Sequence, residues 1–290
     1  MFEGFAPKRI KTSGAEIALV HGGSGLPMLL LHGYPQNHVI WHKVAPRLAQ
    51  QFTLVIPDLR GYGDSSRPPT DAEHYPYSKR AMASDMIEVM SELGFDRFYI
   101  VGHDRGARVT YRLALDHPER VRRAAALDII PTLEQFERAD RFISRAMYHW
   151  YFLSQPAPFP ETLIGKDPDY FLEHSLQSWQ GPGTFSREAL EAYRKSFRDP
   201  EVIHSSCEDY RAGITCDCKF DAADRAAGRK LTMPLLVLWG ARGRRGASLL
   251  ETWRAWADDV RGEGLDCGHF IPEEAPDSLT QHLLSFFEDQ

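Results

Sequence analysis

Short apolar runs alternate with longer segments of helical periodicity along most of the chain. Apolar residues recur at helical spacing in segments 38–50, 78–93 and 105–115. The pattern closes with a short strand near Val260 and a final amphipathic helix. This alternation predicts an α/β fold whose mainly parallel sheet is covered by helices. The runs typical of buried strands are 28–31, 52–56, 98–101, 124–127 and 235–239.

The alternation stops after Pro131, and no convincing strand follows until Met233. Segment 132–230 is instead rich in aromatic residues and helical patterns, which predicts an inserted helical cap. An insertion after the carboxyl end of a strand lies over the usual ligand crevice of such a sheet. We therefore expect a core domain formed by residues 1–131 and 231–290, and a cap domain formed by residues 132–230.

Composition narrows the class of protein. The 290 residues are 43% hydrophobic and 26% charged, and the absence of a long apolar run predicts no membrane span. The net charge of −6, with both signs interspersed, argues against nucleic-acid binding. No segment near the N-terminus resembles a signal peptide, so cytoplasmic residence is the expectation. The four cysteines are too few and too unevenly spaced for a disulfide scaffold or a zinc site, and we expect no metal.

The most specific motif is Val-Gly-His-Asp-Arg-Gly at 101–106, directly after an apolar strand and directly before a helix. This arrangement matches a nucleophile elbow with Asp104 as the nucleophile. Such a turn is strained and crowds the strand, so small residues are needed at Gly102 and Gly106. Spacing alone would also fit a helix N-cap aspartate in a tight turn.

Two further motifs lie after the neighbouring strands: His-Gly-Tyr-Pro at 32–35 and Asp-Leu-Arg-Gly-Tyr-Gly-Asp-Ser at 58–65. With them the sequence resembles the α/β-hydrolase superfamily over essentially its whole length. The resemblance implies a mainly parallel sheet of eight strands. It also implies an oxyanion hole made of the backbone N–H groups of Tyr34 and Arg105. We interpret His32 and Asp58 as residues that brace these loops.

A hydrolase of this type requires a general base, and the expected chain order is nucleophile, acid, histidine. His269 lies in a loop between the last short strand and the last helix, which suits the base. Segment 240–246, after the strand 235–239, contains no carboxylate, whereas Asp128 directly follows the strand 124–127. We therefore predict that Asp128 orients His269. The alternative for Asp128 is a loop-capping role.

A carboxylate nucleophile can displace a leaving group from saturated carbon and form an ester on the enzyme, which water then hydrolyses. Asp104 therefore points mainly to dehalogenases and epoxide hydrolases. Arg105 and Arg108 begin the following helix, three residues apart, and both can converge near its positive end. A guanidinium pair favours an anionic substrate, because a neutral one would leave a desolvated charge unpaired. The alternative is that Arg108 pairs with a protein acid or with solvent.

The motif Asp-Arg-Gly-Ala-Arg at 104–108 closely resembles the fluoroacetate dehalogenases, a branch of this superfamily. The resemblance implies that Arg105 and Arg108 bind the substrate carboxylate. It further implies that three cap residues donate to the departing halide and that a fourth lines the pocket. Hydrolysis of fluoroacetate or another small 2-haloacid to glycolate and halide, without a cofactor, and a homodimer are implied as well. The halide donors would be His149, Trp150 and Tyr210, and the pocket-lining residue would be Trp179. Without the resemblance, we would interpret these aromatic residues as the hydrophobic core of the cap.

Three rival functions differ in the residues they require. An epoxide hydrolase shares the aspartate and typically uses two cap tyrosines, for which Tyr148, Tyr151 and Tyr210 are available; the two arginines speak against it. A haloalkane dehalogenase usually has tryptophan after the nucleophile, where this chain has Arg105. A receptor that has lost catalysis would be expected to have a damaged triad.

Overall fold

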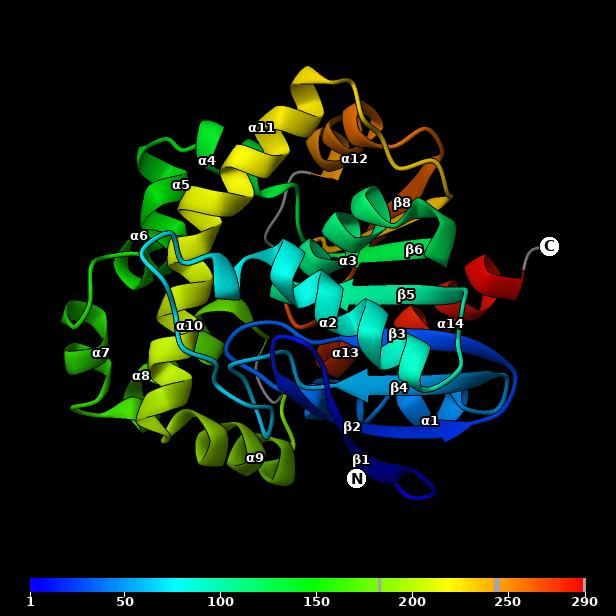
Figure 1. Ribbon diagram of the computed structural model, residues 1–290, viewed down its shortest axis with the longest axis horizontal. Coiled ribbons are helices and arrows are strands. Elements are labelled where there is room, and N and C mark those ends of the chain that lie inside the picture. Colours follow the sequence, from blue (N-terminus) through cyan, green and yellow to red (C-terminus); the bar gives the residue numbers. More distant parts are fainter. Residues whose placement is uncertain (182–183, 243–245, 289–290) are drawn as a thin grey trace.

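The computed structural model describes residues 1–181, 184–242 and 246–288, and its centre is an eight-stranded sheet (Figure 1). The spatial order is β1-β2-β4-β3-β5-β6-β7-β8. Strand β1 pairs antiparallel with β2, and β2 with β4, while the remaining neighbours are parallel. The predicted fold class is thereby confirmed. The strands are β1 Ala6–Lys11, β2 Glu16–Gly23, β3 Leu26–Leu31, β4 Phe52–Pro57, β5 Phe98–His103, β6 Val121–Leu127, β7 Leu235–Gly240 and β8 Val260–Leu265.

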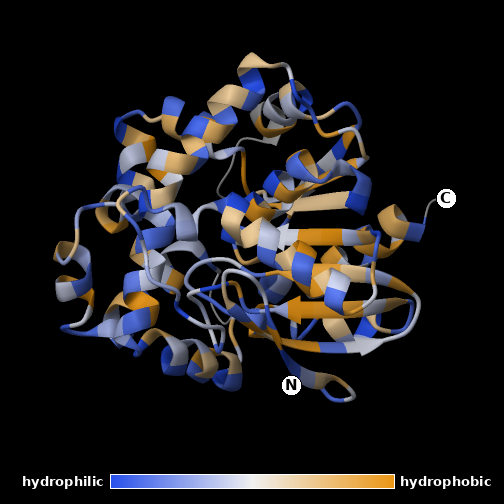
Figure 2. Cartoon of the chain, in the orientation of Figure 1, coloured by the Kyte–Doolittle hydropathy of each residue, from blue (hydrophilic) through white to orange (hydrophobic). Residues whose placement is uncertain are grey.

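Alternate residues of the central strands enter two different hydrophobic cores, because successive side chains of a strand point to opposite faces. In β3, Leu29 and Leu31 join one core, whereas Met28 and Leu30 join the other. Figure 2 shows the resulting concentration of hydrophobic residues in the sheet. The first core is covered by α2 Lys79–Glu92, α3 Arg105–Asp116 and α12 Gly246–Trp256, and the second by α1 Ala45–Leu48, α13 Ile271–Glu274 and α14 Pro276–Glu288.

Every described element between β6 and β7 is helical, and these helices lie beyond the carboxyl ends of the strands (Figure 1). This is the location where an open α/β sheet binds its ligand. The domain division into 1–131 with 231–290 and 132–230 stays a prediction. The helices are α4 Thr132–Glu137, α5 Arg141–Ala146, α6 Tyr148–Leu153, α7 Phe159–Ile164, α8 Pro168–Trp179, α9 Arg187–Phe197, α10 Pro200–Ala212, the π-helical turn η4 Gly213–Asp217, and α11 Cys218–Ala226.

The structure differs from the sequence pattern in segment 38–50, which was expected to be one helix. It contains a 3₁₀ turn, η1 His38–Trp41, and a separate short helix, α1. Pro46 explains the break, because its ring would clash with the carbonyl four residues earlier and it has no N–H to donate. The pattern also did not single out β1 and β2. In β1 only Ile10 is buried, so this edge strand carries almost no hydrophobic signal.

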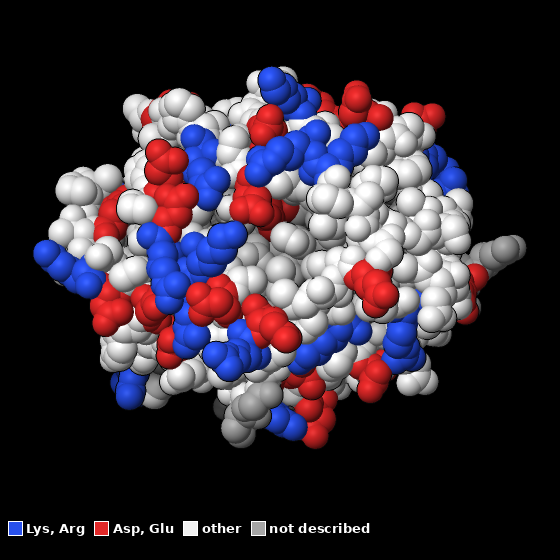
Figure 3. All heavy atoms as spheres, turned by 90° about the horizontal axis from the view of Figure 1, so that it is seen from below, with Lys and Arg blue, Asp and Glu red and all other residues white. Residues whose placement is uncertain are grey.

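Other short elements connect the layers: 3₁₀ turns η2 Tyr75–Tyr77 and η3 Pro118–Arg120. No helix in the described ranges is long and apolar enough to cross a membrane. On the face in Figure 3, basic and acidic side chains are interspersed rather than segregated into a field of one sign.

Candidate active site

Asp104 occupies the strained turn between β5 and α3. Its backbone has φ 49° and ψ −117°, a conformation that side-chain-bearing residues rarely adopt. A Cβ at Gly102 would lie 2.4 Å from the carbonyl oxygen of Gly106, and one at Gly106 would lie 2.3 Å from that of His32. Both glycines are therefore needed for the strand, turn and helix to approach this closely. The strain at one aspartate is typical of a functional position.

The Asp104 carboxylate is held in a fixed orientation. The backbone N–H of Tyr34 donates to its Oδ1 over 2.9 Å, and a Cβ at Gly33 would lie 2.6 Å from the same oxygen. Burial alone would raise the pKa of Asp104, but nearby His269 and the two arginines hold it below its ordinary value. The carboxylate is thus ionised. The structure shows the contact with Tyr34; a donation from the N–H of Arg105 stays a prediction.

His269 and Asp128 lie beside this carboxylate. His269 Nδ1 is 2.5 Å from Asp128 Oδ2, and its Nε2 is 3.9 Å from Asp104 Oδ2. Asp128 also has a positive φ, 58°, and its Oδ1 accepts from the N–H of Gly240 at the end of β7. Asp104, Asp128 and Gly240 thus lie at the carboxyl ends of the adjacent strands β5, β6 and β7, which bring these contacts together. Of segment 240–246, where an alternative acid was sought, residues 243–245 lie outside the described residues.

His103 was not considered in the sequence pattern, although it supports the same group. Its Nε2 lies 2.8 Å from the carbonyl oxygen of His269, and because a carbonyl can only accept, this nitrogen carries the proton. Burial and the neighbouring His269 lower the pKa of His103 to about 4. A neutral His103 therefore anchors the loop that carries the predicted base.

The two arginines at the start of α3 are fully buried but have different partners. Arg105 donates from Nε and Nη2 to Asp209 in the cap helix α10, while its Nη1 has no hydrogen-bond partner among the described residues. Arg108 donates from Nη1 to the carbonyl of Ile130 and to the hydroxyl of Thr132, and its Nε is without a partner there. Each guanidinium thus keeps a buried N–H that no group of the described residues satisfies.

The three predicted halide donors lie together on the cap side. The rings of His149 and Tyr210 are 5.8 Å apart, and those of Trp150 and Tyr210 are 5.7 Å apart. The guanidinium carbon of Arg108 lies 4.4 Å from the Trp150 ring, and that of Arg105 lies 4.2 Å from the Tyr210 ring. The donors and the arginines therefore meet at one place.

His149 is held neutral. Burial lowers its pKa to about 3, although the charge of Asp104 opposes that shift. Its Nδ1 is buried and without a partner among the described residues. Trp179 packs against it with ring centres 4.4 Å apart, and the Trp179 carbonyl accepts from the backbone N–H of His269. Trp179 therefore connects the predicted halide side with the loop of the predicted base.

Sequence reasoning missed several residues that orient the site. The side chain of Tyr34 packs against His149 and Tyr210, although only its backbone was considered. Asp209 and its partner Lys79 were not considered at all. Asp209 directly precedes the proposed site residue Tyr210, and this proximity in the sequence was the one signal available for it. Lys79 has no comparable signal, since lysine at a helix start is ordinarily exposed.

Comparison with known proteins gives three kinds of match: a family, individual relatives and a solved structure. Residues 27–276 match the family described as the alpha/beta hydrolase fold. A fluoroacetate dehalogenase from Burkholderia sp. is 50% identical, over 100% of this chain and 96% of its own. A soluble epoxide hydrolase from Corynebacterium sp. is 36% identical, over 95% of this chain and 94% of its own. A solved structure from Nostoc sp. PCC 7120 is 51% identical, covers 100% of both chains and superposes with a TM-score of 0.98.

Proposed function

This chain belongs to the fluoroacetate dehalogenase family of the α/β-hydrolase superfamily, and we propose that it uses Asp104 to hydrolyse fluoroacetate and other small 2-haloacids. It is a hydrolase; its products from fluoroacetate are glycolate and fluoride, and another 2-haloacid gives the corresponding 2-hydroxyacid and halide. The observation that carries the proposal is an ionised aspartate at a strained elbow beside two buried guanidiniums with unsatisfied N–H groups. The epoxide hydrolase relative above is less similar, so that alternative is not favoured.

The unsatisfied N–H groups of Arg105 and Arg108 bind the substrate carboxylate. A buried donor without a partner costs about 1–3 kcal/mol, and a charge-assisted hydrogen bond contributes about 1.5–3 kcal/mol. An anionic substrate removes the cost and adds the bonds, whereas a haloalkane does neither and an epoxide offers only one uncharged oxygen as an acceptor. The arginines therefore select a haloacid over a neutral substrate that the same nucleophile could attack.

The first chemical step is displacement of the halide. Tyr34 holds Asp104 Oδ1, which leaves Oδ2 to attack the carbon that bears the halogen. The carbon–halogen electron pair leaves with the halide, and an ester forms between Oδ2 and that carbon. Fluoride is strongly hydrated in water, so N–H and O–H donors must replace its water shell. Neutral His149, Trp150 and Tyr210 provide such donors on the cap side.

The second step is hydrolysis of the ester. His269 Nε2 takes a proton from water, and the hydroxide attacks the ester carbonyl carbon of Asp104. The charge that develops on Oδ1 is stabilised by the N–H of Tyr34, with the N–H of Arg105 as the second predicted donor. Asp128 stabilises the protonated His269 through the contact at Nδ1. The Cγ–Oδ2 bond of the tetrahedral intermediate then breaks, protonated His269 returns its proton to Oδ2, and glycolate leaves with that oxygen. Asp104 keeps the oxygen of water, loses its proton and is again a free carboxylate. Residence in the cytoplasm and a homodimeric state stay predictions.

The test measures fluoride release from fluoroacetate with an ion-selective electrode, together with glycolate by chromatography. Asp104→Ala is expected to reduce the rate by at least about 10⁴-fold, because it removes the nucleophile. Arg108→Gln is expected to reduce kcat/KM by about 10- to 100-fold, because a charge-assisted bond is lost. Chloride release from chloroacetate checks the halogen. Absence of halide release from both acids by the wild-type protein overturns the proposal.

A further inference from the structure

We propose that Asp209 is a positioning residue through which the two arginines acquire different roles. Asp209 neutralises the charge of Arg105 and leaves Arg105 Nη1 for the substrate. Arg108 then supplies the positive charge that selects an anion. This inference rests on the proposed function and identifies what determines substrate specificity at the same site. Asp209 touches neither the nucleophile nor the halide donors in the contacts described above. It acts through Arg105.

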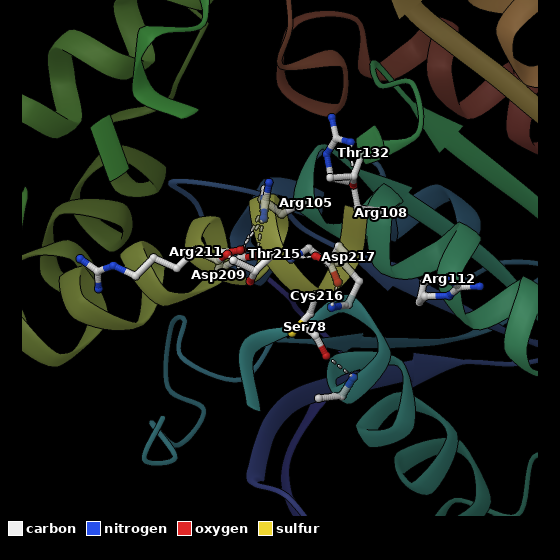
Figure 4. Close-up of polar contacts among 12 residues, drawn as sticks. Ser78, Arg105, Arg108, Arg112, Thr132, Asp209, Arg211, Thr215, Cys216 and Asp217 are labelled. Carbon is white, nitrogen blue, oxygen red and sulfur yellow. Dashed lines mark hydrogen bonds and ion pairs between the residues drawn. The ribbon is translucent and has the colours of Figure 1, made fainter. Parts of the chain in front are cut away.

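Three contacts fix the Arg105 guanidinium against α10. Its Nε lies 3.1 Å from Asp209 Oδ2, and its Nη2 lies 2.5 Å from Asp209 Oδ1 and 2.8 Å from the Asp209 backbone oxygen. Figure 4 shows the end of the Arg105 side chain directed at Asp209. Because these bonds occupy Nε and Nη2, Nη1 is the nitrogen that remains. Arg105 can therefore give a substrate carboxylate only a single-nitrogen contact, not a bidentate one.

Asp209 is itself held from two further directions. Lys79, at the start of α2, forms an ion pair with its Oδ1, and the hydroxyl of Tyr62 donates to its Oδ2 over 2.7 Å. Lys79 and Asp209 are both essentially inaccessible to solvent. Burial alone would raise the pKa of Asp209, but Arg105 and Lys79 lower it, so the carboxylate stays charged. A fully bonded, ionised carboxylate has little freedom to move, and it transmits that rigidity to Arg105.

Arg108 is in a contrasting environment. Its described hydrogen bonds go to the uncharged groups of Ile130 and Thr132, the second of which is labelled beside it in Figure 4. No ion pair between Arg108 and a carboxylate is found in the described ranges. Burial and the neighbouring Arg105 lower the pKa of Arg108 to about 10, whereas Asp209 raises that of Arg105. Arg108 is thus the cation of the pair whose charge is left for a ligand.

The cap helix is shaped to make this contact. Asp209 and Tyr210 are consecutive on α10, and both lie against the Arg105 guanidinium. A Cβ at Gly213, one turn later, would lie only 3.2 Å from Arg105 Nη2, so glycine leaves room for the side chain. The π-helical turn η4 follows at once and brings Asp217 to Lys79, whose backbone N–H donates to Asp217 Oδ1 over 2.8 Å. Such turns are frequent at functional sites.

The test compares two isosteric changes within this network. Asp209→Asn removes the charge that Arg105 contacts, and Asp217→Asn is the matched control, because it removes a second buried carboxylate that contacts Lys79 but not Arg105. We expect Asp209→Asn to raise KM for fluoroacetate by about 10- to 100-fold, with a smaller change in kcat. The dissociation constant for acetate, measured by calorimetry, should rise by a similar factor. Asp217→Asn should leave both values within about twofold of wild type.

Thermal melting of both variants separates a positioning role from a structural one. Should Asp209→Asn fail to fold, Tyr62→Phe replaces it, because this change removes one bond to Asp209 and leaves all charges in place; a smaller rise in KM and in the acetate constant is expected. Equal KM and acetate binding in the Asp209 and Asp217 variants, or tighter acetate binding in Asp209→Asn, overturns the inference. Calorimetry does not depend on turnover, so an inactive wild type that binds acetate would contradict the proposed function and not this inference.

Discussion

The two halves of the site are built in different ways. In the core half, Asp104, Asp128 and His269 lie in loops after the carboxyl ends of β5, β6 and β8, and two of them have positive φ angles. In the cap half, His149 and Tyr210 project from ordinary helices, α6 and α10, and are surrounded by other aromatic rings. The core half depends on backbone geometry, whereas the cap half depends on how helices pack. We therefore expect changes in the core half to affect bond making and changes in the cap half to affect discrimination between leaving groups.

After Asp104→Ala, the largest effect is expected for His269→Gln. Without the base, the ester should still form, but its hydrolysis should slow by about 10²- to 10⁴-fold. One equivalent of halide should therefore be released in a burst, and mass spectrometry should find glycolate esterified to the peptide that contains Asp104. The Asp104→Ala variant is the control and should carry no ester. Steady turnover at the wild-type rate would show that another group acts as the base.

A smaller and more selective effect is expected for Tyr210→Phe in the cap half. Loss of one donor to a developing charge costs about 10²- to 10³-fold in kcat. Fluoride needs these donors more than chloride, so turnover of fluoroacetate should fall further than that of chloroacetate. Tyr193→Phe is the matched control, since Tyr193 is a buried cap tyrosine that donates to Glu273 instead. An equal loss with both substrates would contradict the division between the two halves.

The two halves also share a dependence of stability on pH. The pKa values of His103 and His149 are lowered by burial to about 4 and about 3, so the unfolded chain binds protons that the folded chain does not. The contribution of these neutral histidines to the free energy of unfolding should therefore be fully present above about pH 6.5 and should decrease as the pH falls below it. For His149 the decrease between pH 7.5 and 5 should be about 2 kcal/mol. Urea unfolding at both pH values, with His149→Phe as comparison, measures this. A variant with the wild-type pH dependence would exclude His149 as the cause.

The smallest effect is expected for Trp179→Phe, at the boundary of the two halves. The change removes part of a ring that packs on His149 and preserves the backbone carbonyl that accepts from His269. The enlarged pocket should raise kcat/KM for 2-chloropropionate relative to fluoroacetate by up to about tenfold. Halide release from the two acids in parallel gives the ratio. An unchanged ratio would place Trp179 outside the substrate pocket.

Much of the fold was predictable because strands and long helices carry periodic patterns. The helix in 105–115 and the strand in 98–101 were predicted almost at their observed bounds. Both are buried in the core, and burial imposes a regular spacing of apolar residues along the sequence. The predicted helix 38–50 was wrong because a single proline outweighed the apolar spacing. Strand β1 was not found because an exposed edge strand needs few apolar residues.

The sequence by itself determined the residues of the elbow, the order of Asp104, Asp128 and His269, and the presence of two arginines after the nucleophile. These features are local, because a strained turn accepts few residue types and a parallel sheet brings successive strand ends to one edge. Only the tertiary structure decided that Arg105 is bound to Asp209 while Arg108 has no carboxylate partner in the described ranges. Residues 105 and 209 are far apart along the chain, and ion pairing between a core helix and a cap helix is set by packing that no local pattern encodes.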